Sequence, residues 1–247
     1  MRRFFTEPEN INGNTAVIVE DAAHITRVLR MNIGDCILLF DGTGYEYEAR
    51  LTAVDKDRCE AEITSSSFSE QEPSVKVTIY QGIPKSGKME GIIQKSVELG
   101  VYRIVPVAMD RCVSKLDGGK KEAEKIKRWN KVAVEAAKQC GRGILPQVMS
   151  AVGFDEAISE MTKDDLAIMP YEMLAHNGVR SFKKVLSETT AATISVIIGP
   201  EGGFSDSEAE RAKESGLSLV GLGKRILRTE TVSSAVLAMI MYENGEV

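Results

Sequence analysis

The stretch TISVIIGPEGGFS, residues 193–205, leads from an apolar run through a glycine-rich turn into the start of a helix. Its first six residues, Thr193–Ile198, have the β-branched composition of a buried strand. Ser205 and Glu208 match the Ser-x-x-Glu pattern of a capping box, which predicts that a helix follows. Because three glycines in five positions let the backbone turn sharply and approach a ligand, we interpret this turn as a candidate binding loop.

A second loop of the same kind lies between the next predicted strand and the last predicted helix. It reads LGKRILRTET over Leu222–Thr231. Loops that follow parallel strands form the ligand sites of open α/β sheets, so the two loops together predict one site. Taken singly, this loop has a simpler explanation, in which Thr229 or Thr231 caps the helix. Glu230 would then suit the positive N-terminus of that helix.

Strands and helices alternate along the chain from residue 73 onward. The expected strands are Val75–Gln81, Val101–Val107, Leu166–Met169, Thr193–Ile198 and Leu217–Leu222, and the expected helices are Lys88–Leu99, Lys120–Cys140, Asp206–Ser215 and Val232–Tyr242. This alternation predicts an α/β fold with a mostly parallel sheet that is covered by helices on both faces.

The first 72 residues have a different pattern, with short apolar runs separated by tight turns. We expect strands at Ala16–Val19, Cys36–Phe40, Tyr45–Val54 and Asp57–Thr64, and one short helix at Asp21–Arg30. Many short strands of this kind predict a small β-barrel. The polar stretch Ser65–Pro73 predicts a linker, so we divide the chain into domains at residues 1–72 and 73–247.

The composition indicates a folded protein without a membrane segment or a metal site. Of the 247 residues, 43% are hydrophobic, and no apolar run approaches the roughly 18 residues that span a bilayer. The N-terminal residues Met1–Phe5 lack the apolar core of a signal peptide, so we expect a cytoplasmic protein. The four cysteines form no Cys-x-x-Cys pair and there are two histidines, so we expect no bound metal.

Charge is distributed unevenly within a net charge of −5. Residues 76–149 carry 15 basic and 7 acidic side chains, whereas residues 1–75 carry 7 and 14 and residues 150–247 carry 9 and 15. A basic middle between acidic flanks predicts a face that binds nucleic-acid phosphates. The alternative is the ordinary solvated surface of a helix at Lys120–Cys140, whose lysines are partly offset by glutamates.

The segment Gly82–Met89, GIPKSGKM, approaches the pattern of a nucleotide-binding P-loop but departs from it at two positions. Met89 stands where a serine or threonine hydroxyl would bind magnesium, and Pro84 removes one backbone N–H from the phosphate cradle. We therefore interpret Lys85 and Lys88 as contacts for an RNA phosphate, and keep a nucleotide-phosphate enzyme as an alternative.

The two C-terminal loops together carry a resemblance to a known family. Ile198–Gly203 (IGPEGG) and Leu222–Thr231 resemble the RsmE family of small-subunit ribosomal RNA uridine-N3 methyltransferases, which belongs to the SPOUT superfamily. Supporting matches lie at Arg2–Phe5, His24–Arg30, Lys95–Gly100 and Gln139–Arg142. The resemblance therefore covers essentially the whole chain.

The resemblance implies a PUA-like β-barrel at residues 1–72 that helps to hold RNA, and a SPOUT methyltransferase domain with a deep trefoil knot at residues 73–247. It also implies a homodimer, 16S ribosomal RNA or the small ribosomal subunit as the partner, and S-adenosylmethionine as the cofactor. The residues that it implies for cofactor binding are Tyr171, Glu172, Ile198, Gly199, Glu201, Gly202, Gly203, Leu222, Gly223, Ile226 and Leu227.

The implied reaction is methylation of N3 of a specific uridine, and this nitrogen carries a proton that must leave. A carboxylate that accepts the proton and an arginine that stabilises the resulting anion would supply this chemistry. We expect these roles for Glu230 and Arg228, with a purely positioning role for Glu230 as the alternative. The resemblance further suggests that an N-terminal arginine, Arg3 or Arg2, reaches the same pocket.

Several basic residues are expected to contact RNA. They are Arg2, Arg27, Arg30, Lys85, Lys88 and Arg142. Two further interpretations stay open at this point: a related enzyme that methylates a transfer RNA ribose, and an RNA-binding module without catalytic activity.

Overall fold

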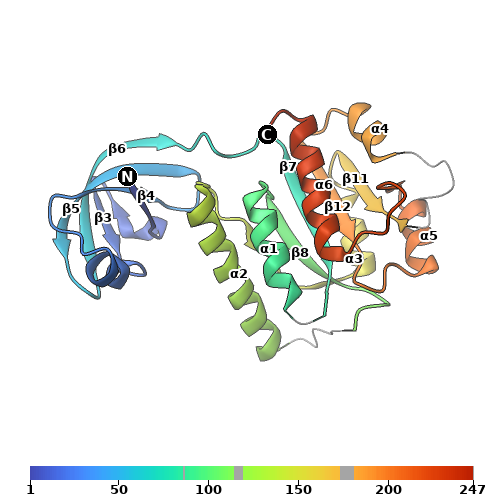
Figure 1. The fold of residues 1–247 in the computed structure, drawn as a ribbon, viewed down its shortest axis with the longest axis horizontal. Coiled ribbons are helices and arrows are strands. Elements are labelled where there is room, and N and C mark those ends of the chain that lie inside the picture. Colours follow the sequence, from blue (N-terminus) through green and yellow to red (C-terminus); the bar gives the residue numbers. More distant parts are fainter. Residues whose placement is uncertain (86, 114–118, 173–180, 247) are drawn as a thin grey trace. The chain divides into compact units, whose positions relative to one another are not determined.

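The computed structural model describes every residue except 86, 114–118, 173–180 and 247, and it divides into two compact units (Figure 1). The first unit comprises Met1–Glu72 together with Ala137–Leu145, and the second comprises Pro73–Ala136 together with Pro146–Val247. Among the described residues, no helix is both long and apolar enough to cross a membrane.

The first unit is built on a six-stranded sheet in the order β1-β4-β5-β6-β3-β2. Its elements are β1 (Arg2–Phe5), η1 (Pro8–Asn10), β2 (Ile11–Asn12), β3 (Thr15–Ile18), η2 (His24–Val28), β4 (Cys36–Phe40), β5 (Tyr45–Val54) and β6 (Cys59–Phe68). Strand β1 pairs in parallel with β4, and the other neighbours pair antiparallel. Alternate residues of β4, Ile37 and Leu39, pack into one buried core with Ile18 and Leu51.

The second unit contains a parallel sheet in the order β10-β8-β7-β12-β11-β13, with β9 paired to β8. Its strands are β7 (Lys76–Gly82), β8 (Arg103–Ala108), β9 (Gln147–Val148), β10 (Val152–Gly153), β11 (Leu166–Pro170), β12 (Thr193–Ile198) and β13 (Ser218–Val220). Its helices are α1 (Lys88–Glu98), α2 (Lys120–Cys140), α3 (Phe154–Met161), α4 (Phe182–Ser187), α5 (Asp206–Glu214) and α6 (Thr229–Glu243). The last four residues of α2 belong to the first unit.

Helices bury both faces of the parallel sheet. Tyr80 of β7 and Ile197 of β12 pack in one apolar cluster with residues of α3 and α5. Their neighbours Ile79 and Val196 are also buried and point to the opposite face, because side chains alternate along a strand. Helices α1 and α6 lie side by side and contact each other on that face (Figure 1). Burial on both faces explains why these strands are continuous apolar runs.

The predicted α/β class is confirmed, but several predicted boundaries are wrong. Ser65–Phe68 extends strand β6 instead of beginning a linker, because these residues pair with the start of β5. The expected helix at Asp21–Arg30 is a short π-helix, η2. Helix α6 begins at Thr229 and not at Val232, which places Glu230 inside its first turn.

The sequence-based prediction lacks strand β1, helices α3 and α4, and the short elements η1, β2, β9 and β10. Strand β1 was not expected because its first two residues are charged arginines, although Phe4 and Phe5 are buried. Helices α3 and α4 have eight and six residues, which is too short for a clear helical period. The trefoil knot stays a prediction.

Candidate active site

A cavity of about 420 Å³ lies beyond the C-terminal ends of β11, β12 and β13. Three chain segments form most of its wall: the residues after β11, the glycine loop after β12, and the loop that leads from β13 into α6. All eleven residues predicted to bind a cofactor line this cavity, namely Tyr171, Glu172, Ile198, Gly199, Glu201, Gly202, Gly203, Leu222, Gly223, Ile226 and Leu227. The sequence-based prediction therefore identified one continuous surface, at the sheet edge where open α/β folds bind ligands.

The glycine loop after β12 is compact because it folds back on itself. The backbone N–H of Gly203 donates to the carbonyl oxygen of Pro200 at 2.9 Å. Gly203 has a φ of +68°, and a Cβ atom there would overlap with the carboxylate of Glu172. The positive φ therefore favours glycine at this position, and any larger side chain would have to displace the Glu172 carboxylate. The predicted capping box of Ser205 and Glu208 is confirmed, and it fixes the start of α5 directly after the loop.

An ion triad stands at the rim of the cavity. Lys88 Nζ lies 3.1 Å from Glu201 Oε1 and 3.3 Å from Glu230 Oε2. The hydrogen bond to Glu201 and the further bond to Glu230 raise the pKa of Lys88. Lys88 was expected to hold an RNA phosphate, but in this structure its charge is satisfied by two carboxylates that line or border the cavity.

The two carboxylates of the triad remain ionised at neutral pH. Glu201 is partly desolvated, which raises its pKa, but hydrogen bonds from its own backbone N–H and from Lys88 outweigh this effect and hold the pKa below its ordinary value. The pKa of Glu230 is lowered by its own backbone N–H, and also by Lys88 and Arg228. Glu230 is therefore a carboxylate that can accept a proton.

Arg228 and Thr229 connect helix α6 to the cavity. Arg228 is the N-cap residue of α6 and has extended backbone angles, with φ −70° and ψ 152°. Thr229 is the first residue of the helix and is 4% exposed. Its hydroxyl donates to the carbonyl oxygen of Gly199 at 2.7 Å. The alternative explanation, in which Thr229 caps the helix, is wrong, because Arg228 is the N-cap residue and the Thr229 hydroxyl joins the helix to the glycine loop.

In the segment that resembles a P-loop, a backbone N–H group that could bind a phosphate is already bound to the carboxylate of Glu201. The backbone N–H of Lys85 points to both carboxylate oxygens of Glu201, each at 3.2 Å. A phosphate would compete with this carboxylate for the same donor. The nucleotide-phosphate alternative is therefore disfavoured. Among the described residues, no group of three or more histidine, cysteine, aspartate or glutamate side chains could hold a metal ion.

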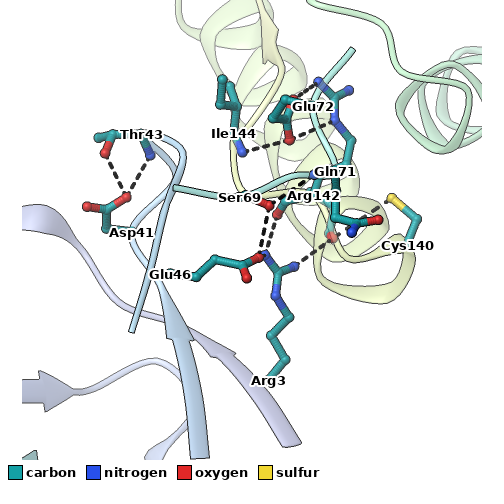
Figure 2. Close-up of polar contacts among 11 residues, drawn as sticks. Arg3, Asp41, Thr43, Glu46, Ser69, Gln71, Glu72, Cys140, Arg142 and Ile144 are labelled. Atoms are coloured by element: carbon teal, nitrogen blue, oxygen red, sulfur yellow. Dashed lines mark hydrogen bonds and ion pairs between the residues drawn. The ribbon is translucent and has the colours of Figure 1, made fainter. Parts of the chain in front are cut away.

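Two arginines predicted as functional are enclosed within the first unit, where carboxylates neutralise them (Figure 2). Arg142 is 5% exposed, and its Nη2 lies 2.7 Å from Glu72 Oε2. The expectation that Arg142 contacts RNA is wrong, because a phosphate cannot reach a guanidinium that is buried against a carboxylate. The Glu72 carboxylate also accepts the backbone N–H of Ile144 at 3.0 Å, so this pair fixes the turn after α2.

Arg3 has a similar environment in the same unit. Its Nη2 donates to Glu46 Oε1 at 2.7 Å and to the carbonyl oxygen of Arg142 at 2.8 Å (Figure 2). Its guanidinium also lies 4.0 Å from the centre of the Phe40 ring. These contacts give Arg3 a structural role in holding strand β1 to the turn after α2. Its predicted catalytic role is not supported by this arrangement.

The remaining basic residues predicted to contact RNA are accessible. Arg2, Arg27, Arg30 and Lys85 are exposed, the first three in the first unit and Lys85 in the second. Arg30 also has a φ of +50°, which is uncommon for a residue other than glycine. These four side chains are free to meet a polyanion, so their predicted role stays open.

The sequence-based prediction missed residues that form hydrogen bonds with the residues lining the cavity. The guanidinium of Arg111 donates to the carbonyl oxygen of Gly202 at 3.1 Å, and the carboxylate of Asp206 accepts at 3.1 Å from the hydroxyl of Tyr171, which was itself predicted. No motif marks Arg111, because its contact joins positions 91 residues apart in the chain. Thr229 stands inside a quoted motif, but its bond to the glycine loop could not be inferred from spacing.

Comparison with known proteins gives the family of the chain. Residues 70–241 match the RNA methyltransferase domain family. The chain belongs to this family. Residues 19–64 match the PUA domain of RNA methyltransferases, which confirms the PUA-like character expected for the first unit. The RNA methyltransferase match includes all three segments that form the cavity.

Two relatives of this RNA methyltransferase align with nearly its full length. Ribosomal RNA small subunit methyltransferase E of Bacillus subtilis is 37% identical over 98% of the chain and 97% of the relative. The enzyme of the same name from Aquifex aeolicus is 30% identical over 98% and 99% of the two chains. A crystal structure of the Neisseria gonorrhoeae enzyme of that name, bound to S-adenosyl methionine, has a TM-score of 0.85 at 35% identity over 98% and 97%. The family predicted from the two C-terminal loops is confirmed.

Proposed function

We propose that this RNA methyltransferase transfers a methyl group from S-adenosylmethionine to N3 of a specific uridine in the 16S ribosomal RNA of the small subunit. The observation that carries this proposal is the convergence of all eleven expected cofactor contacts on one cavity. The relatives named ribosomal RNA small subunit methyltransferase E support the substrate, and the Neisseria gonorrhoeae structure supports the cofactor.

The chemistry of the cavity fits S-adenosylmethionine. Its volume of about 420 Å³ lies in the range of sites for small molecules. Ile198, Leu222 and Leu227 would supply an apolar surface for the adenine ring, and the backbone of the lining glycines would offer it hydrogen-bonding groups. Glu172 and Glu201 place negative charge in the wall, which suits a ligand with a cationic sulfonium. When bound, this cofactor supplies an electrophilic methyl group.

The residues at the rim would then prepare the uracil. N3 must lose a proton before it can attack a methyl group, and Glu230 is an ionised acceptor at neutral pH. Arg228 is exposed beside it and would stabilise negative charge on the uracil oxygens. The ion pair between Lys88 and Glu230 is equally compatible with a positioning role for Glu230, and substitution by glutamine separates the two roles.

The first domain would bind the surrounding RNA. We assign residues 1–72 as the PUA-like RNA-binding domain and residues 73–247 as the methyltransferase domain. Exposed Arg2, Arg27 and Arg30 would contact phosphates from the first domain, and Lys85 from the second. The homodimer, the trefoil knot and a cytoplasmic location are part of the same proposal, since all three follow from the family.

The deciding experiment combines purified protein, S-adenosylmethionine labelled in its methyl group, and small ribosomal subunits that lack the modification. The RNA is digested and the labelled nucleoside is identified. We expect the label in 3-methyluridine. If the label is found in a 2′-O-methyl nucleoside, the assignment of the cofactor stands, but the assignment of N3 as the methylated atom is wrong. Failure to bind S-adenosylmethionine would favour an RNA-binding module without catalytic activity.

A further inference from the structure

We propose that Gln81 is a positioning residue for the cofactor site, and that it acts through Thr229 on the backbone of the glycine loop. Gln81 is the second-last residue of the central strand β7 and is fully buried. This inference rests on the proposed function, because it assumes that the cavity described above holds S-adenosylmethionine.

A relay of two hydrogen bonds leads from Gln81 to the cavity wall. Gln81 Nε2 donates to Thr229 Oγ1 at 2.9 Å, and Thr229 Oγ1 donates to the carbonyl oxygen of Gly199 at 2.7 Å. Thr229 and Gly199 both line the cavity. The relay therefore joins the end of β7, the first residue of α6 and the loop after β12, which are three separate segments of the chain.

The donors and acceptors of the relay allow one orientation of the amide. Gln81 Nε2 also donates to the carbonyl oxygen of Gly82 at 3.0 Å, and a carbonyl can only accept. The Thr229 hydroxyl donates its single proton to the carbonyl oxygen of Gly199, so it can only accept the hydrogen bond from Gln81 Nε2. A rotated amide would place two acceptors against each other at both contacts. The hydroxyl of Thr229 is consequently held with its proton toward the glycine loop.

The stability of the fold does not explain why an amide stands at this position. Among the described residues, Gln81 Oε1 has no hydrogen-bond partner although it is buried. An unsatisfied buried acceptor costs free energy, which an apolar side chain of similar size would avoid. The amide instead contributes two hydrogen bonds donated by Nε2, one to Gly82 and one to Thr229, and Thr229 lines the cavity.

The glycine loop needs such an external anchor. Its glycines have little conformational preference of their own, so contacts must fix the peptide planes that face a ligand. The loop also passes close to the end of β7, because a Cβ atom on Gly82 would lie 2.7 Å from the backbone nitrogen of Pro200. With the Gly199 carbonyl held by Thr229, the peptide between Gly199 and Pro200 keeps one orientation, and the cavity is preformed for its ligand.

The test compares affinity for S-adenosylmethionine, measured by calorimetry without RNA, with stability measured by urea denaturation. For Gln81→Met we expect an affinity loss of roughly tenfold, as for one lost hydrogen bond, and a denaturation midpoint equal to or above that of the wild type. The matched control is Gln94→Met, which changes an exposed glutamine of α1 and should alter neither quantity. Wild-type affinity in a folded Gln81→Met protein would overturn the inference.

Variants of Thr229 test the same relay from its other end. Thr229→Ser keeps the hydroxyl and should bind S-adenosylmethionine like the wild type, whereas Thr229→Val should lose roughly tenfold in affinity. Because both substitutions break one relay, the double variant of Gln81→Met and Thr229→Val should bind no more weakly than the weaker single variant. A hundredfold, additive loss would contradict a shared relay. If the wild type itself binds no S-adenosylmethionine, the proposed function fails and this inference fails with it.

Discussion

Lys88 Nζ donates to Glu230 Oε2 across 3.3 Å, although the two residues are 142 positions apart in the chain. The contact brings the start of α1 to the start of α6 and places a fixed positive charge beside the proposed proton acceptor. It also ties both helices to the glycine loop, since Glu201 takes a second contact from the same ammonium group. We expect substitution of Glu230 to lower the rate of methylation, and substitution of Lys88 to change how the stability of the protein depends on pH.

Glu230→Gln removes the proposed acceptor while keeping the shape of the side chain. If Glu230 takes the uracil proton, kcat should fall by about 100-fold or more, and the affinity for S-adenosylmethionine should stay unchanged. Single-turnover methylation of small subunits and calorimetry measure the two quantities. Glu243→Gln, at the exposed end of α6, is the control. Full methylation activity in Glu230→Gln would leave Glu230 with a positioning role.

Lys88→Met should make stability less dependent on acid pH. Glu201 and Glu230 have folded-state pKa values below the ordinary 4.5, so their ion pairs contribute stability above that pH and lose it as the pH falls through the lowered values. The stability difference between wild type and Lys88→Met should therefore be largest at neutral pH and shrink below pH 4.5. Urea denaturation at several pH values measures it, with Lys95→Met as the exposed control. A difference that is constant with pH would contradict the triad.

Gly203→Ala should damage the cavity more than the fold. Alanine at a φ of +68° costs about 1–2 kcal/mol, and its Cβ would also displace the Glu172 carboxylate from the wall of the cavity. We expect weaker binding of S-adenosylmethionine in calorimetry. Gly216→Ala has a comparable φ of +89° with no atom within 4 Å of the new Cβ, so it should share the cost in stability but not the loss of affinity.

Arg142→Met should destabilise the protein by about 3–5 kcal/mol, because it leaves the carboxylate of Glu72 buried without its cation. Combining it with Glu72→Gln should recover part of this loss. Urea denaturation is the measurement. The salt dependence of RNA binding should not change, in contrast to the expectation for an arginine that contacts phosphate.

Arg27→Gln should weaken RNA binding at every salt concentration and reduce the slope of log affinity against log salt by about one. Filter binding to ribosomal RNA between low and moderate salt measures both quantities. Arg58→Gln provides the control, since Arg58 is also exposed but lies 2.9 Å from Glu60. If the slopes of log affinity against log salt are identical for wild type and Arg27→Gln, Arg27 does not contact an RNA phosphate.

The sequence was sufficient to predict the longer strands and helices of the second unit and the cavity wall, because each wall segment follows a strand whose apolar run is clear. The glycines of the loop after β12 are visible in the sequence. In the structure Gly203 has a positive φ, and a Cβ at Gly199 or Gly202 would lie close to neighbouring atoms. The prediction failed where a charged residue could be either exposed or paired. Lys88 and Arg142 look alike in the sequence, yet one borders the cavity and the other is buried against Glu72.

The polar contacts behind the cavity could not be predicted for a related reason. Gln81 and Thr229 are 148 positions apart, and their hydrogen bond depends on how β7 and α6 end at the same edge of the sheet. Periodicity describes which face of an element is buried, but it does not pair a buried amide with a hydroxyl on another element. Such pairs become visible only when the fold is known.

The assignment of Ala137–Leu145 to the first unit has a consequence for synthesis of the chain. A fragment that stops at residue 72 lacks this segment, and its buried Glu72 would have no arginine partner. During translation, the first unit cannot complete its contacts until residue 145 has left the ribosome, by which time part of the parallel sheet has also been made. The N-terminal unit is therefore not an independent module that can be cut from the protein at the end of β6.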